Sequence, residues 1–255
     1  MSDYYKDLIQ ISKSSITSKS LAAHIDNKLG LSRYVKDSKF VAKLAKNAGV
    51  VLDLGCGQGH ISYLLAKQGC NVVASEVFDE EPIYISKFNS EDNENTIEYL
   101  PTNILNPNHA LEGRKFDIVL LYGVLEHVPN FSLFLNKASE LLTENGDLVI
   151  YQFPNRYSFF EKLNETFRKT SHDIRLSKQE LRLLLNLNTF SVKEMKYHQF
   201  LPYNLNNFPT FIRKFYYSLG PLIRVIDSIL YTIPIVSIFS TSIYVRAKKS
   251  LSVKS

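Results

Sequence analysis

One stretch, residues 50–60, constrains the fold of this chain more than any other. It reads Val-Val-Leu-Asp-Leu-Gly-Cys-Gly-Gln-Gly-His, an apolar run followed by three glycines at alternate positions. Ile61, Leu64 and Leu65 then recur at the spacing of a helix. The pattern predicts a buried strand, a tight turn and a helix N-terminus, because glycine permits positive φ and lets a ligand approach the backbone.

The spacing of the glycines separates this loop from common phosphate-binding loops. A P-loop requires Lys-Ser/Thr after its last glycine, whereas His60 and Ile61 follow here, and a dinucleotide fingerprint has G-x-G-x-x-G rather than G-x-G-x-G. Asp53, before the first glycine, would repel a pyrophosphate but suits an ammonium group. A second predicted strand over 71–75 ends at Glu76, whose carboxylate suits two ribose hydroxyls. The expected ligand is a phosphate-free nucleoside with a cationic tail, such as S-adenosylmethionine.

Residues 53–59, with Glu76 after them, resemble the cofactor motif of class I S-adenosylmethionine-dependent methyltransferases. The resemblance covers about residues 35–200 and resumes near 241–247. In the family an Asp commonly stands at Asn103 and accepts from the adenine amino group, while Ile104 would pack on adenine. A plain turn role for Asn103 is the alternative. The implied cofactor-binding residues are Asp53, Gly55, Cys56, Gly57, Gly59, Glu76, Asn103, Ile104 and Tyr122.

The resemblance implies an α/β Rossmann-like fold with a seven-stranded sheet, mostly parallel with the last strand antiparallel. The expected organisation is an N-terminal helical cover (1–34), a cofactor-binding core (35–204), an amphipathic helical insertion (205–240), and a last strand with a basic tail (241–255). Gly30 is expected to end a helix, and Asn145-Gly146 to form a turn before the fifth strand. Ser177 with Glu180 predicts a capping box.

Two histidines are candidate general bases, because methylation of a hydroxyl of high pKa benefits from a nearby base. The pair Glu126-His127 resembles that of ubiquinone-biosynthesis and small-RNA 3′-end methyltransferases. In those groups another Glu three residues earlier helps bind a divalent metal, but Gly123 stands there, so no metal is expected. A structural role for His127 is the alternative. His172, in an aromatic and basic stretch over 155–176, is the second candidate.

Charge is unevenly distributed along the chain, whose net charge is +5. Residues 161–255 carry fifteen Lys and Arg against six Asp and Glu, which predicts either an ordinary solvated surface or one facing an anion. Residues 205–240 are cationic, aromatic-rich and amphipathic, with a break expected at Gly220-Pro221. Such a stretch is typical of an interfacial membrane helix. The alternatives are a cap on the core or a contact with a second subunit, and Pro234 argues against a membrane span.

These features predict an enzyme that methylates a hydroxyl of a small molecule, a lipid-linked intermediate or a saccharide. The alternatives are a protein or nucleic-acid methyltransferase and a non-catalytic cofactor-binding protein of the same fold. Nucleic acid is not an expected partner, because the basic residues do not cluster with a known binding module. Two cysteines without metal-like spacing, and no signal-peptide pattern, predict a cytoplasmic protein with peripheral contact at the inner membrane face through 205–240. The oligomeric state stays open.

Overall fold

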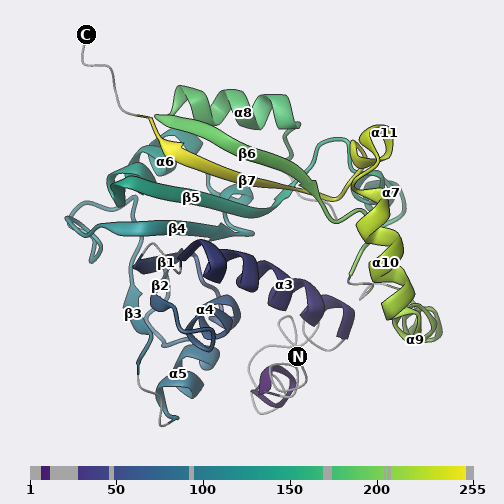
Figure 1. Ribbon diagram of the computed structural model, residues 1–255, viewed down its shortest axis with the longest axis horizontal. Coiled ribbons are helices and arrows are strands. Elements are labelled where there is room, and N and C mark those ends of the chain that lie inside the picture. Colours follow the sequence, from purple (N-terminus) through teal and green to yellow (C-terminus); the bar gives the residue numbers. More distant parts are fainter. Residues whose placement is uncertain are drawn as a thin grey trace.

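The computed structural model describes residues 7–11, 28–45, 49–91, 95–168, 174–203, 205 and 208–250 (Figure 1). Its centre is a seven-stranded sheet in the order β3-β2-β1-β4-β5-β7-β6. Every neighbouring pair is parallel except those of β7, which runs antiparallel to both β5 and β6. The strands are β1 (Val50–Leu54), β2 (Asn71–Glu76), β3 (Glu98–Pro101), β4 (Phe116–Tyr122), β5 (Leu142–Pro154), β6 (Phe190–His198) and β7 (Ser242–Lys249). The predicted fold class is confirmed.

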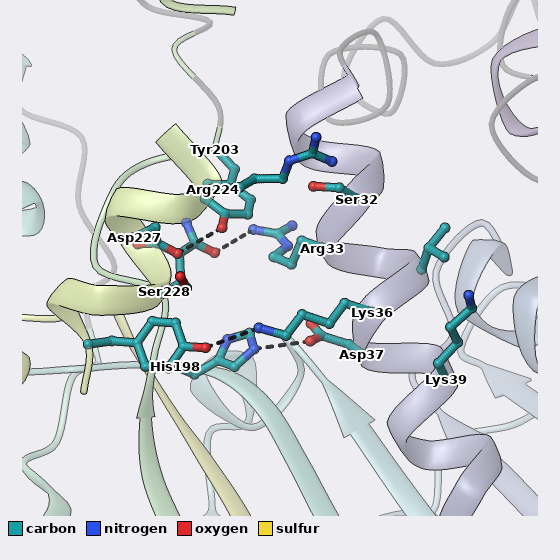
Figure 2. Close-up of a pocket in the computed structure, with 13 residues that line it drawn as sticks. Ser32, Arg33, Lys36, Asp37, Lys39, His198, Tyr203, Arg224, Asp227 and Ser228 are labelled. Atoms are coloured by element: carbon teal, nitrogen blue, oxygen red, sulfur yellow. Dashed lines mark hydrogen bonds and ion pairs between the residues drawn. The ribbon is translucent and has the colours of Figure 1, made fainter. Parts of the chain in front are cut away.

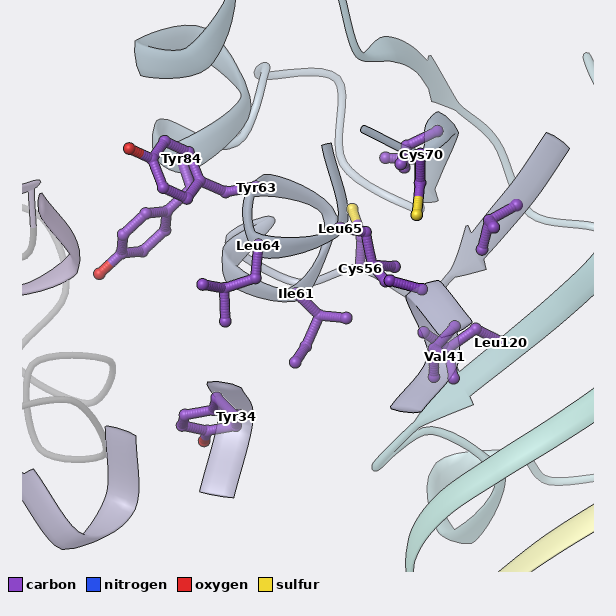
Figure 3. Close-up of a cluster of buried hydrophobic side chains, with 14 of the residues drawn as sticks. Tyr34, Val41, Cys56, Ile61, Tyr63, Leu64, Leu65, Cys70, Tyr84 and Leu120 are labelled. Carbon is purple, nitrogen blue, oxygen red and sulfur yellow. The ribbon is translucent and has the colours of Figure 1, made fainter. Parts of the chain in front are cut away.

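Helices cover both faces of the sheet, which explains why β4 is apolar along its whole length. Ile118 and Leu120 point into a core shared with α3, α4 and α5, whereas Val119 and Leu121 point into a core shared with α6 and α8 (Figure 3 shows part of the first). The helices are α3 (Lys28–Ala45), α4 (His60–Ala66), α5 (Ile83–Asn89), η1 (Leu125–His127), α6 (Phe131–Glu140), α7 (Phe159–Arg168), α8 (Lys178–Leu187), α9 (Thr210–Ser218), α10 (Gly220–Leu230) and α11 (Pro234–Ser237).

The helix stop predicted at Gly30 is wrong, because α3 runs through that residue. Glycine inside a helix costs about 1 kcal/mol relative to alanine. Its neighbours Leu29 and Leu31 are both buried, and burial of side chains of that size outweighs the cost. The helix therefore begins earlier than the sequence suggests and extends past the sheet edge to α10.

The turn predicted at Asn145-Gly146 is also wrong, since both residues lie within β5. The pairing of β5 with β4 jumps there, from Phe116 opposite Leu142 to Ile118 opposite Asp147. The intervening residues form an irregularity inside one long strand.

Two local predictions hold. Ser177 and Glu180 form a capping box at the start of α8, with Ser177 N donating to Glu180 Oε2 at 2.8 Å. The break at Gly220-Pro221 separates α9 from α10.

Helices α9 to α11 connect β6 to β7 in the sequence, and they project beyond the end of the sheet (Figure 1). The two ends of this excursion meet, because Thr241 N donates to Gln199 O at 2.8 Å. None of the helices in the described ranges is both long enough and apolar enough to cross a membrane.

Candidate functional site

The turn after β1 is fastened to β2 by backbone hydrogen bonds. Gly55 N and Cys56 N both donate to Ser75 O, at 2.8 and 3.0 Å. Gly55 has φ +80°, and an added Cβ would lie 2.6 Å from Val124 Cγ2, so the position requires glycine. Gly57 has φ +54° and nothing within 4 Å of an added Cβ, so its backbone borders open space where a ligand can approach.

Glu76 is the last residue of β2 and lies against this turn. Its predicted contact with the ribose hydroxyls stays a prediction. Its Oε2 accepts from Gly57 N at 3.0 Å, and its Oε1 accepts from Val77 N at 2.8 Å. A carboxylate has about four lone-pair positions, so each oxygen can accept a further hydrogen bond from a ligand hydroxyl.

Asp53 is buried at the end of β1, with 1% of its surface exposed. Its Oδ2 accepts from Ser62 Oγ at 2.5 Å, which fastens the first turn of α4. Burial raises the pKa of Asp53 to about 6, the hydrogen bond from Ser62 opposes the shift, and the charge of Glu76 adds to it. Asp53 thus holds the first turn of α4 against the end of β1. Its predicted contact with an ammonium group stays a prediction.

Asn103 and Ile104 follow β3 at the same edge of the sheet. The side chain of Asn103 accepts from Leu105 N at 2.9 Å, so it shapes the local turn, and its amide oxygen has capacity for a second bond. Ile104 is buried in the core. Their adenine contacts stay predictions, beside the turn role that Asn103 visibly performs.

Cys56 and Gly59 belong to the turn itself. Cys56 is buried, and burial, with the charges of Asp53 and Glu76, raises the pKa of its thiol. Gly59 has φ +82° and directly precedes α4; an added Cβ would lie 2.5 Å from Ile85 Cγ1. Both residues therefore shape the turn, and their predicted cofactor contacts stay predictions.

Tyr122, at the end of β4, belongs to a hydrogen-bonded group that sequence reasoning missed. Its hydroxyl donates to Asp37 Oδ2 at 2.8 Å, and His198 Nε2 lies 3.0 Å from Asp37 Oδ1. Gln152 Nε2 lies 3.0 Å from His198 Nδ1, while Arg33 donates to Gln152 Oε1 at 3.4 Å. Because Arg33 only donates, the Gln152 amide donates to His198 Nδ1, and Nε2–H donates to Asp37. These five residues are called the Asp37 network below.

The Asp37 network stands where the carboxyl ends of β4, β5 and β6 meet α3. Gln152 has φ +61° and Gln199 has φ +60°, a conformation uncommon outside glycine. Both amide oxygens accept from Arg33 Nη1. Such backbone conformations cluster at functional sites. The sequence signals are a lone polar residue in the apolar strand around Gln152, and Arg33 one helical turn before Asp37.

Of the two predicted general bases, only His127 lies within the described residues. His127 is exposed in η1, directly after the end of β4. His172 lies outside the described residues. Within the described ranges no group of three His, Cys, Asp or Glu side chains could hold a metal ion.

Comparison with protein families gives one decisive match. The model of a methyltransferase domain family matches residues 45–201, more than half of the chain. The chain belongs to the methyltransferase domain family. The matched range contains the glycine turn, Glu76, Tyr122 and His198, whereas Arg33 and Asp37 of the Asp37 network precede it.

Relatives of this family member include two ubiquinone biosynthesis O-methyltransferases. The protein of Pelagibacter ubique is 31% identical over 100 residues, which cover 39% of this chain and 40% of the relative. That of Haemophilus ducreyi is 30% identical over 164 residues, covering 60% of this chain and 69% of the relative. This chain thus spans less than half the length of the first relative.

Among solved structures, the magnesium protoporphyrin IX methyltransferase of Synechocystis PCC 6803 with bound SAH is similar in fold. The TM-score is 0.60 at 16% identity, covering 97% of this chain and 94% of that one. The likeness extends over nearly the whole family member and supports the assigned fold.

Proposed function

We propose that this chain is an S-adenosylmethionine-dependent methyltransferase that methylates a hydroxyl of a small-molecule acceptor. The observation that carries the proposal is the open backbone at Gly57 beside the Glu76 carboxylate. The residues fit the cofactor. The space beside Gly57 is open because glycine has no Cβ, and each carboxylate oxygen of Glu76 can accept a further hydrogen bond from a ribose hydroxyl. Family membership and the O-methyltransferase relatives support the reaction class.

In this proposal the turn and its surroundings hold the cofactor. Glu76 accepts from the ribose hydroxyls, Asn103 and Ile104 contact the adenine, and Asp53 attracts the ammonium group. S-adenosylmethionine, when bound, supplies an electrophilic methyl group on a positively charged sulfur. The chain's own contribution is to position donor and acceptor in line.

His127 is the proposed general base, and His172 is the second candidate. His127 follows the carboxyl end of β4, where doubly wound folds place their reacting groups. His198 is less suited, because both of its ring nitrogens are engaged in the Asp37 network. His127→Asn should lower kcat by about 10²-fold or more without changing cofactor affinity, and His172→Asn is the matched comparison. An unchanged kcat in both variants would exclude both bases.

The reaction proposal is tested with the cofactor itself. Isothermal titration should detect binding of S-adenosylmethionine to the full chain. Incubation with methyl-labelled cofactor and fractionated cell extract should then label a small molecule, whose identification gives the acceptor. Absence of cofactor binding would overturn the proposal. Binding without labelling of any fraction would favour the non-catalytic alternative.

We further propose that residues 205–240 contact an anionic lipid surface, at the inner face of a membrane. Their outer face is largely apolar, with Phe211 and Phe215 exposed on α9, Leu222, Val225 and Ile229 exposed on α10, and Ile235 exposed on α11. Helix α9 also carries Arg213 and the exposed Lys214. Asp227 is the one acid of this segment, and it is buried. Apolar area combined with positive charge favours an anionic bilayer over a neutral protein partner.

Vesicle flotation tests this contact. The full chain should float with anionic vesicles, and Phe211→Ser with Phe215→Ser should abolish flotation, whereas Leu183→Ser with Leu187→Ser, exposed on α8, should not. Sedimentation velocity of the same variants distinguishes a second copy of the chain as the occupant. A dimer that the Phe variants dissociate, without flotation of the parent, would overturn the membrane contact.

A further inference from the structure

A cavity of about 320 Å³ lies between α3, the chain after β6 and α10 (Figure 2). It is distinct from the glycine turn, whose residues do not line it. Two acids line the cavity, Asp37 and Asp227. Four Lys and Arg side chains also line it, Arg33, Lys36, Lys39 and Arg224, together with His198.

Neutral donors already occupy both acids. Asp227 accepts from Phe200 N and Leu201 N, each at 2.7 Å, and from the Tyr203 hydroxyl at 2.7 Å. Asp37 accepts from the two donors of its network. Across the described ranges, no ion pair joins either acid to any of the four cations. The positive charge of the cavity therefore lacks a direct carboxylate partner within that part of the chain.

The partners of the cations are neutral as well. Arg33 Nη1 donates to Gln152 and Gln199, at 3.4 and 3.2 Å, and both acceptors are uncharged amides. Arg33 Nε is buried and has no hydrogen-bond partner among the described residues. Lys36 Nζ donates to the Tyr231 hydroxyl at 3.1 Å. Burial disfavours the charged guanidinium of Arg33, and the nearby charge of Asp37 favours it without forming an ion pair, so an anionic ligand would supply a direct charged partner.

One aromatic side chain, that of Tyr34, lies between the cavity and the helix that follows the glycine turn. The guanidinium carbon of Arg33 lies 4.6 Å from the centre of the Tyr34 ring. The Tyr34 ring meets the ring of His60 edge-on, with centres 4.5 Å apart, and His60 is the first residue of α4 after the turn. A ligand that reaches from the cavity across Tyr34 would thus approach the candidate cofactor site.

We propose that this cavity binds the phosphate or diphosphate group of the methyl acceptor. The inference deepens the proposed function, because it rests on that function for naming the ligand an acceptor. Four cations with no directly paired acid suit a multiply charged anion, and Arg guanidinium binds phosphate oxygens through two parallel N–H groups. Arg224 extends from α10 toward α3 (Figure 2), while Leu222 and Val225 beside it in sequence are exposed. The phosphate can belong to a soluble ester or to a lipid.

The first test titrates inorganic pyrophosphate into the full chain by calorimetry. The cavity variant, Lys36→Gln with Arg224→Gln, should bind pyrophosphate about tenfold or more weakly than the parent, since each lost charge removes a charge-assisted hydrogen bond. The control variant, Lys43→Gln with Lys193→Gln, changes the same charge at exposed sites outside the cavity and outside residues 205–240, and should bind within about twofold of the parent. Both replaced cavity residues are exposed, so folding is preserved.

The second arm identifies the source of the phosphate. Phosphatidylcholine vesicles with and without phosphatidic acid are offered to the same three proteins. If the lipid is the source, phosphatidic acid selectively retains the parent and the control variant but not the cavity variant. If a soluble ester is the source, pyrophosphate binds without vesicles and lipid composition makes no difference between the variants.

Two results from the variants would overturn the proposal. One is equal affinity of the cavity and control variants in both arms. The other is a cavity variant that loses affinity for S-adenosylmethionine but keeps it for pyrophosphate, which would assign the cavity to the cofactor's own carboxylate. Cofactor titration of the parent separates this failure from failure of the proposed function, because a parent that binds cofactor but not pyrophosphate refutes only the anion site.

Discussion

His198 Nε2 lies 3.0 Å from Asp37 Oδ1, and this hydrogen bond joins the last residue of β6 to the middle of α3. Tyr122 donates to the other oxygen of the same carboxylate, from the end of β4. One buried acid therefore fixes a helix near the start of the chain to two strand ends at the edge where the candidate site lies. The position of α3 over that edge depends on this carboxylate.

Replacement of Asp37 tests this dependence. Asp37→Asn keeps the size of the side chain but removes its charge. It also replaces one carboxylate oxygen by an NH₂ group, which would face the donor of Tyr122 or of His198. We expect the free energy of unfolding to fall by about 2–4 kcal/mol, since two hydrogen bonds to a charged group are weakened. Urea denaturation measures it, and Asp79→Asn on an exposed loop is the control. Equal urea midpoints for both variants would show that α3 is held by packing alone.

Replacement of Glu76 tests the cofactor assignment. Glu76→Gln should weaken S-adenosylmethionine binding by about 10- to 100-fold, because a neutral amide accepts more weakly and only one of its two ends accepts. Calorimetry gives the dissociation constant. Glu80→Gln, at an exposed position in the loop after β2, removes the same charge without touching the glycine turn and should leave affinity unchanged. A dissociation constant for Glu76→Gln within about twofold of the parent would contradict ribose binding by this residue.

The raised pKa of Asp53 predicts a pH dependence of stability. Its folded-state pKa is about 6 against an ordinary value of 3.8, so the folded state holds the proton more tightly than the unfolded state. The free energy of unfolding should therefore fall as pH rises from about 4 to about 6, by roughly 3 kcal/mol from this group. Asp53→Asn removes that titration, so unfolding curves of parent and variant should diverge over this range. Parallel profiles from pH 4 to 7 would argue against the raised pKa.

Alanine variants of Gly55 and Gly69 compare the cost of a steric clash with the cost of backbone strain alone. Their φ values are +80° and +81°, but an added Cβ at Gly55 would meet Val124, whereas at Gly69 nothing lies within 4 Å. Both alanine variants should be destabilised by about 1–2 kcal/mol from the left-handed conformation. Gly55→Ala should lose a further amount of about 1–3 kcal/mol from overpacking. Thermal unfolding of the two variants measures the difference, and equal losses would show that Val124 moves aside freely.

Much of the fold follows from local signals in the sequence. The strand, glycine turn and helix around residues 50–66, the apolar run of β4 and the capping box at Ser177 each depend on neighbours within a few positions. Such signals fix elements and, through the carboxyl-end rule, place Glu76 beside the glycine turn. The helix through Gly30 was mispredicted because its stability comes from the burial of Leu29 and Leu31, which local propensity does not reveal.

The Asp37 network could not be predicted for a different reason. Its members come from α3, β4, β5 and β6, and its hydrogen bonds join residues between 46 and 161 positions apart. No periodicity encodes the positive φ of Gln152, which depends on the break in pairing between β5 and β7 near that residue. Sequence spacing indicates which edge of a sheet a residue occupies, but not which distant side chains complete its hydrogen bonds.

The residues before α9 and after α11 are hydrogen-bonded to each other, and this limits which parts of the chain depend on these helices. Thr241 donates to Gln199 O through both its amide and its hydroxyl, and Ser242 donates to His198 O. Strands β6 and β7 therefore stay paired up to the residues between which the helices are inserted. A change of length within α9 to α11 can therefore leave the pairing of β6 with β7 and the glycine turn intact, provided that the contact of α10 with α3 is kept.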